Sequence, residues 1–223
     1  MKKRTQFTER DITVLQALSL QVRLFGQRQL ADALWAGDIA NARRRLNRFV
    51  ELGLLKRNVV MARPLPELLS PVFVWQPGND APDSSQIAFQ LQSRWRYRAL
   101  RSTVVFLPTD ITVNHFGGRN KAVLSSQVSH DLGVSEVWLW FCCNHPSYAK
   151  AWRGENLITD SEPGQSMPDA VLLDSNDQAA VLIEFGGDYD ADRIAAFHDD
   201  AVLRGLPYQI WYITDARTNL PNP

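Results

Sequence analysis

The uneven distribution of charge along the chain restricts most strongly what it can fold into. The 223 residues carry a formal net charge of zero. Residues 1–101 contain 17 Lys and Arg against 8 Asp and Glu, whereas residues 102–223 contain 7 against 16. Because each sign of charge is concentrated in one half, we expect two modules with different partners. The basic module is a candidate for nucleic-acid binding.

The basic half begins with three segments whose apolar residues recur at helical spacing. The first covers residues 8–22, where Thr8 is a typical N-cap and Ile12 opens the apolar stripe. The second covers residues 26–35. The third covers residues 38–53, with an aspartate as N-cap and a glycine at its end. The sequence therefore predicts three consecutive helices.

Two β-prone runs follow these helices, at residues 54–63 and 71–78, and a proline-containing segment joins them, which is typical of a hairpin. Three helices and a hairpin predict a winged helix-turn-helix domain over residues 1–78, whose third helix enters the major groove. Polar residues of that helix and of the hairpin are the predicted DNA contacts: Arg43, Arg44, Arg45, Asn47, Arg48, Lys56, Arg57 and Arg63. A solvated helix face and a protein-binding winged helix are the alternatives.

Residues 79–101 are predicted to connect the two modules. A Gly/Pro/Asp/Ser stretch precedes a helix from about residue 85 to 100, in which arginines alternate with Trp95 and Tyr97. Such a helix could extend the DNA contact through phosphate binding and stacking, or it could serve as a connecting or dimerisation helix. The sequence leaves both roles open.

The acidic half, residues 102–223, is predicted to alternate strands and helices. The expected order begins with a strand at 102–113 and a buried helix at 129–143, and continues with strands at 152–159, 167–174 and 180–187, a helix at 191–205 and a strand at 207–215. Two carboxylates, Asp169 and Glu184, stand in neighbouring strands of this series.

This order resembles the PD-(D/E)xK nuclease superfamily, which has a restriction-endonuclease-like α/β fold. The resemblance implies that Asp169 and Glu184 are the metal ligands, that Glu136 from the preceding helix completes the metal shell, and that the ion is Mg²⁺. Gly186 stands where the catalytic lysine belongs, and no lysine follows Lys150. We therefore expect a catalytically degenerate domain without a cofactor, with Mg²⁺-dependent DNA cleavage as the alternative.

A second resemblance covers nearly the whole chain. The segments SHDLGVSEV, MPDAVLLD and VLIEFGG are similar to those of the replication-relaxation family of plasmid and mobile-element proteins. In that family His130 and Glu136 belong to a shared motif, and Asp169 and Glu184 mark the remnant site. The resemblance implies a sequence- or structure-specific DNA-binding protein that regulates transcription or assists plasmid replication or transfer.

Partners and location complete these expectations. The chain has no apolar run that could cross a bilayer and no signal peptide, which favours a cytoplasmic protein without membrane contact. The adjacent Cys142 and Cys143 are expected to lie in the core. Double-stranded DNA is the predicted partner, and the C-terminal domain is expected to serve a homodimer or a protein partner. A protein adaptor that contacts no DNA is a further alternative.

Overall fold

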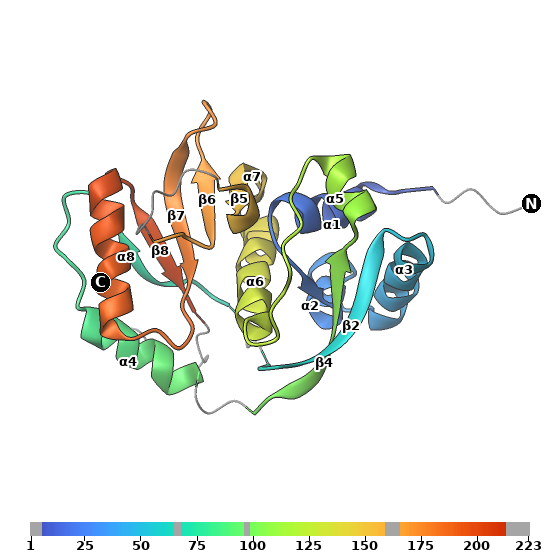
Figure 1. The fold of residues 1–223 in the computed structure, drawn as a ribbon, viewed down its shortest axis with the longest axis horizontal. Coiled ribbons are helices and arrows are strands. Elements are labelled where there is room, and N and C mark those ends of the chain that lie inside the picture. The colour runs from blue at the N-terminus through green and yellow to red at the C-terminus, as the bar shows by residue number, and fades with distance from the viewer. Residues whose placement is uncertain (1–5, 65–67, 96–98, 159–165, 213–223) are drawn as a thin grey trace, which may run out of the picture.

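The computed structural model describes residues 6–64, 68–95, 99–158 and 166–212. In this part of the chain, eight α-helices and two β-sheets form a mixed α/β structure (Figure 1). A three-stranded sheet lies at one end of the molecule with α1, α2, α3 and α5, and a five-stranded sheet lies at the other end with α4 and α8. None of the helices in the described ranges has the length and apolar character that crossing a bilayer requires.

The three predicted N-terminal helices are confirmed as α1 (Glu9–Leu20), α2 (Gln27–Leu34) and α3 (Ile39–Glu51). Thr8 caps α1 in a reciprocal capping box, and an aspartate caps α3 through the backbone N–H three residues later. The predicted apolar stripe of α1 is wrong at its first position, because Ile12 is 45% exposed while the later apolar residues are buried.

The predicted hairpin is wrong. β2 (Leu55–Ala62) pairs along its whole length with β4 (Arg101–Pro108), and the short β1 (Phe25–Gly26) pairs with the other edge of β4. The second predicted hairpin strand, β3 (Pro71–Trp75), instead joins the five-stranded sheet beside β8 (Tyr208–Trp211). The physical reason is its aromatic residue: the ring of Trp75 stacks on Tyr208 and is buried there.

The strand pairing interleaves the two halves of the molecule. β4, expected to open the acidic module, completes the first sheet, while β3 and α4 (Ser84–Trp95) lie with the second. The segment that follows β4 was predicted to remain extended to residue 113 but forms α5 (Asp110–Phe116), because Thr109 caps a helix there. Sheet membership therefore does not follow the predicted boundaries at residues 78 and 101.

The five-stranded sheet has the order β3-β8-β7-β6-β5. β5 (Trp152–Gly154), β6 (Ala170–Leu173) and β7 (Ala179–Phe185) are antiparallel neighbours, whereas β7 and β8 are parallel. Parallel strands need a crossover connection, which α8 (Ala191–Arg204) supplies. The predicted strands at 167–174 and 180–187, the crossover helix and the last strand are confirmed within the described residues, whereas the strand predicted at 152–159 is limited to Trp152–Gly154 because a 3₁₀ turn follows it. α4 packs against α8.

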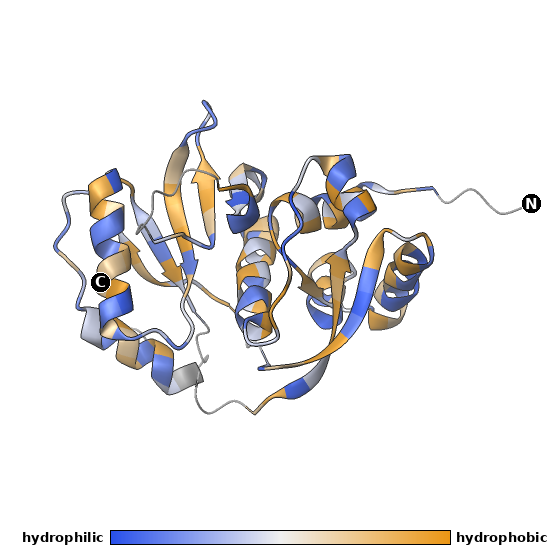
Figure 2. Cartoon of the chain, in the orientation of Figure 1, coloured by the Kyte–Doolittle hydropathy of each residue, from blue (hydrophilic) through white to orange (hydrophobic). Residues whose placement is uncertain are grey.

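The predicted buried helix is α6 (Val128–Asn144), which lies between the two sheets (Figure 1). It packs against both sheets and against α7 (Pro146–Ala151), so it is apolar on nearly every side. Figure 2 shows the same pattern in the largely apolar strands β6 and β7, in contrast to the mixed surface of α8. The expectation of two core cysteines is wrong for Cys143, which is exposed, while Cys142 is half-buried. Consecutive helical residues point about 100° apart, so both could not face one core.

Candidate functional site

The structure brings Asp169 and Glu184 together at the start of β6 and the end of β7. The backbone N–H of Asp169 donates to Glu184 Oε2 at 3.2 Å, and the backbone N–H of Phe185 donates to Asp169 Oδ2 at 2.7 Å. Antiparallel pairing of the two strands produces this exchange, because it places residue 169 beside residues 184 and 185. The side chains are 11% and 5% exposed, so the pair is largely removed from water.

Three further side chains surround this pair. His130 of α6 places Nε2 3.3 Å from Asp169 Oδ2. The Tyr189 hydroxyl donates to Glu184 Oε1 at 2.6 Å, and Arg193 donates to that hydroxyl at 2.9 Å. The Arg193 guanidinium also lies 3.9 Å from Glu184 Oε1 and 3.9 Å from the centre of the Tyr189 ring. We call these five residues the carboxylate cluster.

Burial and charge together set the protonation of the cluster. Burial and the neighbouring Asp169 charge raise the pKa of Glu184 to about 8. Burial alone would lower the pKa of His130, but the Asp169 charge and hydrogen bonds to Asp131 and Asp169 outweigh it and raise that pKa well above its ordinary value. Folding therefore favours the protonated form of both His130 and Glu184.

Glu136 does not join the cluster. Its Oε2 accepts a hydrogen bond at 2.7 Å from Gln29 of α2, on another side of α6. Six residues along a helix correspond to a rotation of roughly 240°, so Glu136 and His130 cannot face the same neighbour. The acid of α6 that lies near Asp169 is Asp131, and both line one small cavity.

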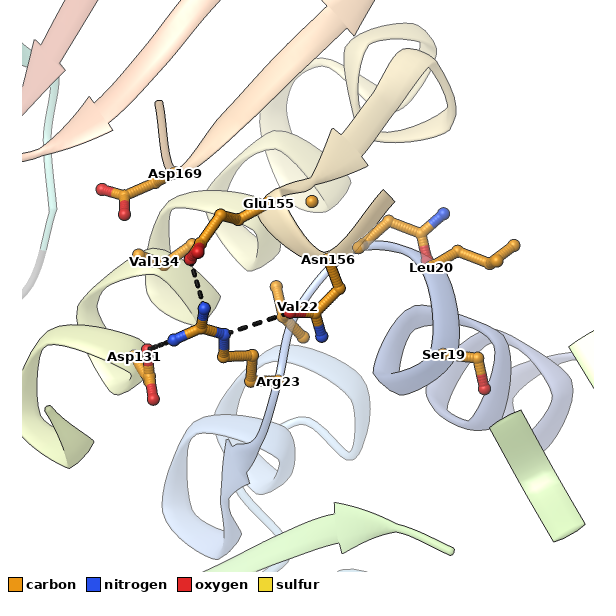
Figure 3. Close-up of a pocket in the computed structure, with 11 residues that line it drawn as sticks. Ser19, Leu20, Val22, Arg23, Asp131, Val134, Glu155, Asn156 and Asp169 are labelled. Atoms are coloured by element: carbon orange, nitrogen blue, oxygen red, sulfur yellow. Dashed lines mark hydrogen bonds and ion pairs between the residues drawn. The ribbon is translucent and has the colours of Figure 1, made fainter. Parts of the chain in front are cut away.

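This cavity of about 20 Å³ is lined by Asp169 and by the side chain of Arg23 (Figure 3). Arg23 comes from the segment between α1 and β1. It donates to Asp131 Oδ1 at 3.4 Å and to Asn156 Oδ1 at 3.3 Å, and it forms an ion pair with Glu155 in the 3₁₀ turn η1 (Glu155–Leu157). The end of α1 and the segment after it thus line this cavity together with α6, η1 and the start of β6, and Arg23 joins them.

Sequence analysis missed the site roles of Arg23, Asp131 and Glu155. His130 was noted only as part of a motif. The available signal was the occurrence of HD and WRGE within otherwise apolar segments. Periodicity cannot show which charged side chain is buried beside which other, because that depends on contacts between distant elements.

The residues of the carboxylate cluster do not fit the Mg²⁺ ion that the nuclease resemblance implies. Three of the four oxygens of Asp169 and Glu184 accept hydrogen bonds from described residues, and His130 and Arg193 supply positive charge at the same place. Within the described ranges no group of three or more His, Cys, Asp or Glu is arranged to hold a metal.

The lysine position of the nuclease motif is closed by packing. A Cβ atom added to Gly186 would lie 2.6 Å from Leu91 Cδ2 of α4. We expect Gly186→Ala to lower the free energy of unfolding by about 1–3 kcal/mol through overpacking. Urea unfolding of Gly186→Ala, Leu91→Ala and the double variant measures the coupling. If Gly186→Ala lowered the free energy of unfolding by the same amount in the Leu91→Ala background, contact between the added methyl group and Leu91 would not be the cause of the loss.

The predicted DNA contacts separate into exposed and engaged residues. Arg43 and Arg44 of α3 and Lys56 and Arg57 of β2 are exposed. The Arg44 guanidinium donates a hydrogen bond to Asn41 Oδ1 of the same helix at 3.0 Å. The other four predicted contacts are half-buried: Arg45, Asn47, Arg48 and Arg63. We use the name basic face for these four exposed residues of α3 and β2, of which Lys56 and Arg57 are consecutive in a strand and so point to opposite sides of the sheet.

Arg45 belongs to the interior contacts of the helices rather than to the basic face. Its Nε donates to Asp11 Oδ1 at 2.9 Å, and its NH2 group contacts Asp11 Oδ2 and the backbone oxygen of Gln6. The guanidinium also lies 5.1 Å from the centre of the Phe49 ring. Arg45 therefore joins α3 to the capped start of α1. Arg48 likewise pairs with Glu51 at 2.8 Å.

A comparison with models of protein families, with curated proteins and with solved structures found no match to this chain. The resemblances to the nuclease superfamily and to the replication-relaxation family therefore stay predictions from motifs.

Proposed function

We propose that the chain is a double-stranded DNA-binding protein whose first half is a winged helix. The support is topological: three helices are followed by an antiparallel sheet of order β1-β4-β2, with β1 between α1 and α2. In this proposal β2 and β4 form the wing. The wing differs from a simple hairpin, because its strands lead into β3 and α4 instead of a short turn.

The observation that carries the proposal is the basic face. α3 and β2 lie side by side (Figure 1), and each exposes two cationic side chains. Guanidinium groups bind phosphates or guanine edges in bidentate fashion, and lysine adds a phosphate contact. The basic face thus combines a helix suited to the major groove with flanking contacts to the backbone.

The second half is proposed to be a nuclease-like domain that serves as scaffold. Its order of helix, three antiparallel strands, crossover helix and parallel strand agrees with the PD-(D/E)xK resemblance. The carboxylate cluster carries its own cations and lacks room for a lysine at position 186. The proposed role is regulation or assistance of plasmid or mobile-element replication or transfer, without cleavage of DNA.

A binding titration tests the proposal. We expect the double variant Arg43→Ala/Arg44→Ala to bind a labelled 30-base-pair duplex at least ~10-fold more weakly than the wild type, since each lost contact costs about 1 kcal/mol or more. Fluorescence anisotropy measures the dissociation constants. The charge-matched control is Arg119→Ala/Lys150→Ala, which removes two exposed cations outside the basic face.

The outcomes distinguish the proposed function from its alternatives. Equal weakening in both double variants would indicate non-specific attraction, and no binding by the wild type would favour a protein adaptor. Incubation of supercoiled plasmid with Mg²⁺ or Mn²⁺ checks the endonuclease alternative. Nicking by the wild type that disappears in Asp169→Asn would overturn the proposed scaffold role.

A further inference from the structure

The carboxylate cluster forms a closed network of contacts between four elements. α6 supplies His130, the start of β6 supplies Asp169, β7 supplies Glu184, and the segment leading into α8 supplies Tyr189 with Arg193 one turn later. The hydroxyl of Tyr189 also lies 3.4 Å from His130 Nε2. The network therefore links the helix between the sheets with the crossover helix through the middle of the second sheet.

Buried carboxylates need positive charge nearby, because removing them from water is costly. A divalent metal can supply that charge. Here Nε2 of His130 lies 3.3 Å from Asp169 Oδ2, and the guanidinium of Arg193 lies 3.9 Å from Glu184 Oε1. Both groups belong to the polypeptide, and each lies within 4 Å of a carboxylate oxygen.

Packing fixes His130 in this position. Its ring meets the ring of Phe185 edge-on, with centroids 5.7 Å apart. Phe185 can approach α6 only because residue 133 is glycine, where an added Cβ would lie 2.1 Å from the Phe185 ring. Gly133 and Phe185 therefore hold the imidazole against Asp169, where β6 begins and β7 ends.

We infer that His130 and Arg193 are built-in counter-cations that replace a divalent metal ion at the Asp169–Glu184 pair. The pair is then a metal-independent structural latch between α6, β6, β7 and α8. This inference does not depend on whether the basic face binds DNA, so an experiment can contradict the latch without contradicting DNA binding, and the reverse.

Thermal unfolding in the presence and absence of divalent ions tests the inference. After treatment with EDTA, the wild type is expected to unfold at the same temperature, within about 1 °C, with or without Mn²⁺ or Mg²⁺, since a ligand that does not bind the folded state cannot stabilise it. The variant His130→Gln retains a polar side chain but removes the cation. It is expected to unfold about 5 °C lower or more.

The same variant is expected to respond to metal. Without the imidazole ring 3.3 Å away, the Asp169 carboxylate lacks its nearest side-chain partner and becomes available as an oxygen ligand, so Mn²⁺ should raise the unfolding temperature of His130→Gln and not that of the wild type. The electron paramagnetic resonance spectrum of Mn²⁺ reports its binding directly. The control is His115→Gln, an exposed histidine on α5.

Three results would overturn the inference. They are stabilisation of the EDTA-treated wild type by Mn²⁺, a loss of stability in His130→Gln no larger than in His115→Gln, and a His130→Gln variant that binds no Mn²⁺. If His130→Gln does not fold, Arg193→Gln replaces it in all three comparisons, since Arg193 is 61% exposed and its removal leaves no cavity.

Discussion

Replacing Arg45 with alanine is expected to lower the free energy of unfolding by about 3–5 kcal/mol, because it leaves the buried carboxylate of Asp11 without its cation. The Asp11 side chain is only 1% exposed, and Arg45 bonds both of its oxygens. Burial opposes ionisation of Asp11, but the hydrogen bonds from Arg45 and Thr8 outweigh it and lower its pKa. Urea unfolding at pH 7 measures the loss.

The matched control is Arg44→Ala, one position earlier on the same helix. Arg44 is exposed and its guanidinium donates to Asn41 of the same helix, so this change should cost about 0.5 kcal/mol or less. At a temperature where both variants are folded, Arg44→Ala should weaken DNA binding more than Arg45→Ala does. Similar stability in both would show that the Asp11–Arg45 pair contributes little.

The second large effect is a fall in stability as the pH rises from about 5 to 9. Glu184 and His130 both have a pKa raised by folding. A group of this kind contributes stability that is fully present below its unfolded pKa and is lost as the pH rises through its folded pKa. For Glu184 the window runs from about 4.5 to about 8. Each unit of difference corresponds to about 1.4 kcal/mol, so a loss of a few kcal/mol is expected.

The variant Glu184→Gln isolates this effect. Glutamine remains uncharged at every pH, so the fall in unfolding free energy between pH 5 and pH 9 should be smaller in the variant than in the wild type. Asp188→Asn, an exposed acid four residues later, is the control and should leave the slope unchanged. A wild-type slope equal to that of Glu184→Gln would mean that Glu184 is ionised in the folded protein at neutral pH.

Six of the eight helices in the described residues could be predicted, because their signals are local, whereas α5 was expected to be a strand and α7 was not expected. Thr8 and the aspartate before α3 act on backbone groups three residues away, and apolar spacing along α3 or α8 repeats within one turn. Gly205 ends α8 with φ of 64°, a conformation that glycine adopts without strain. These elements need no information from distant parts of the chain.

The strand partners could not be predicted, because pairing joins distant segments. β2 and β3 look like a hairpin by sequence distance alone, yet β2 pairs with residues 101–108 and β3 with residues 208–211. Both runs contain β-branched residues that favour a strand, and that preference fits any partner strand with a suitable face. As a result, each of the two predicted modules contributes a strand to the sheet of the other.

Within the site, sequence analysis identified the acids but not their cations. Asp169 and Glu184 came from a motif, whereas Arg23 and His130 come from segments more than 35 residues before them. The arginine run of α3 shows the same limit. Arg44 and Arg45 are adjacent and chemically identical, and only the position of Asp11 on α1 assigns one to the surface and the other to the interior.

The salt dependence of DNA affinity tests the central claim most directly. Dissociation constants of the wild type and of Arg43→Ala/Arg44→Ala should be measured for one duplex between 50 and 200 mM salt, roughly the range over which counterion release dominates. If both arginines contact phosphates, the slope of log K against log salt should become shallower by about 2 in the variant. An identical slope and affinity in the two proteins would contradict DNA binding through the basic face.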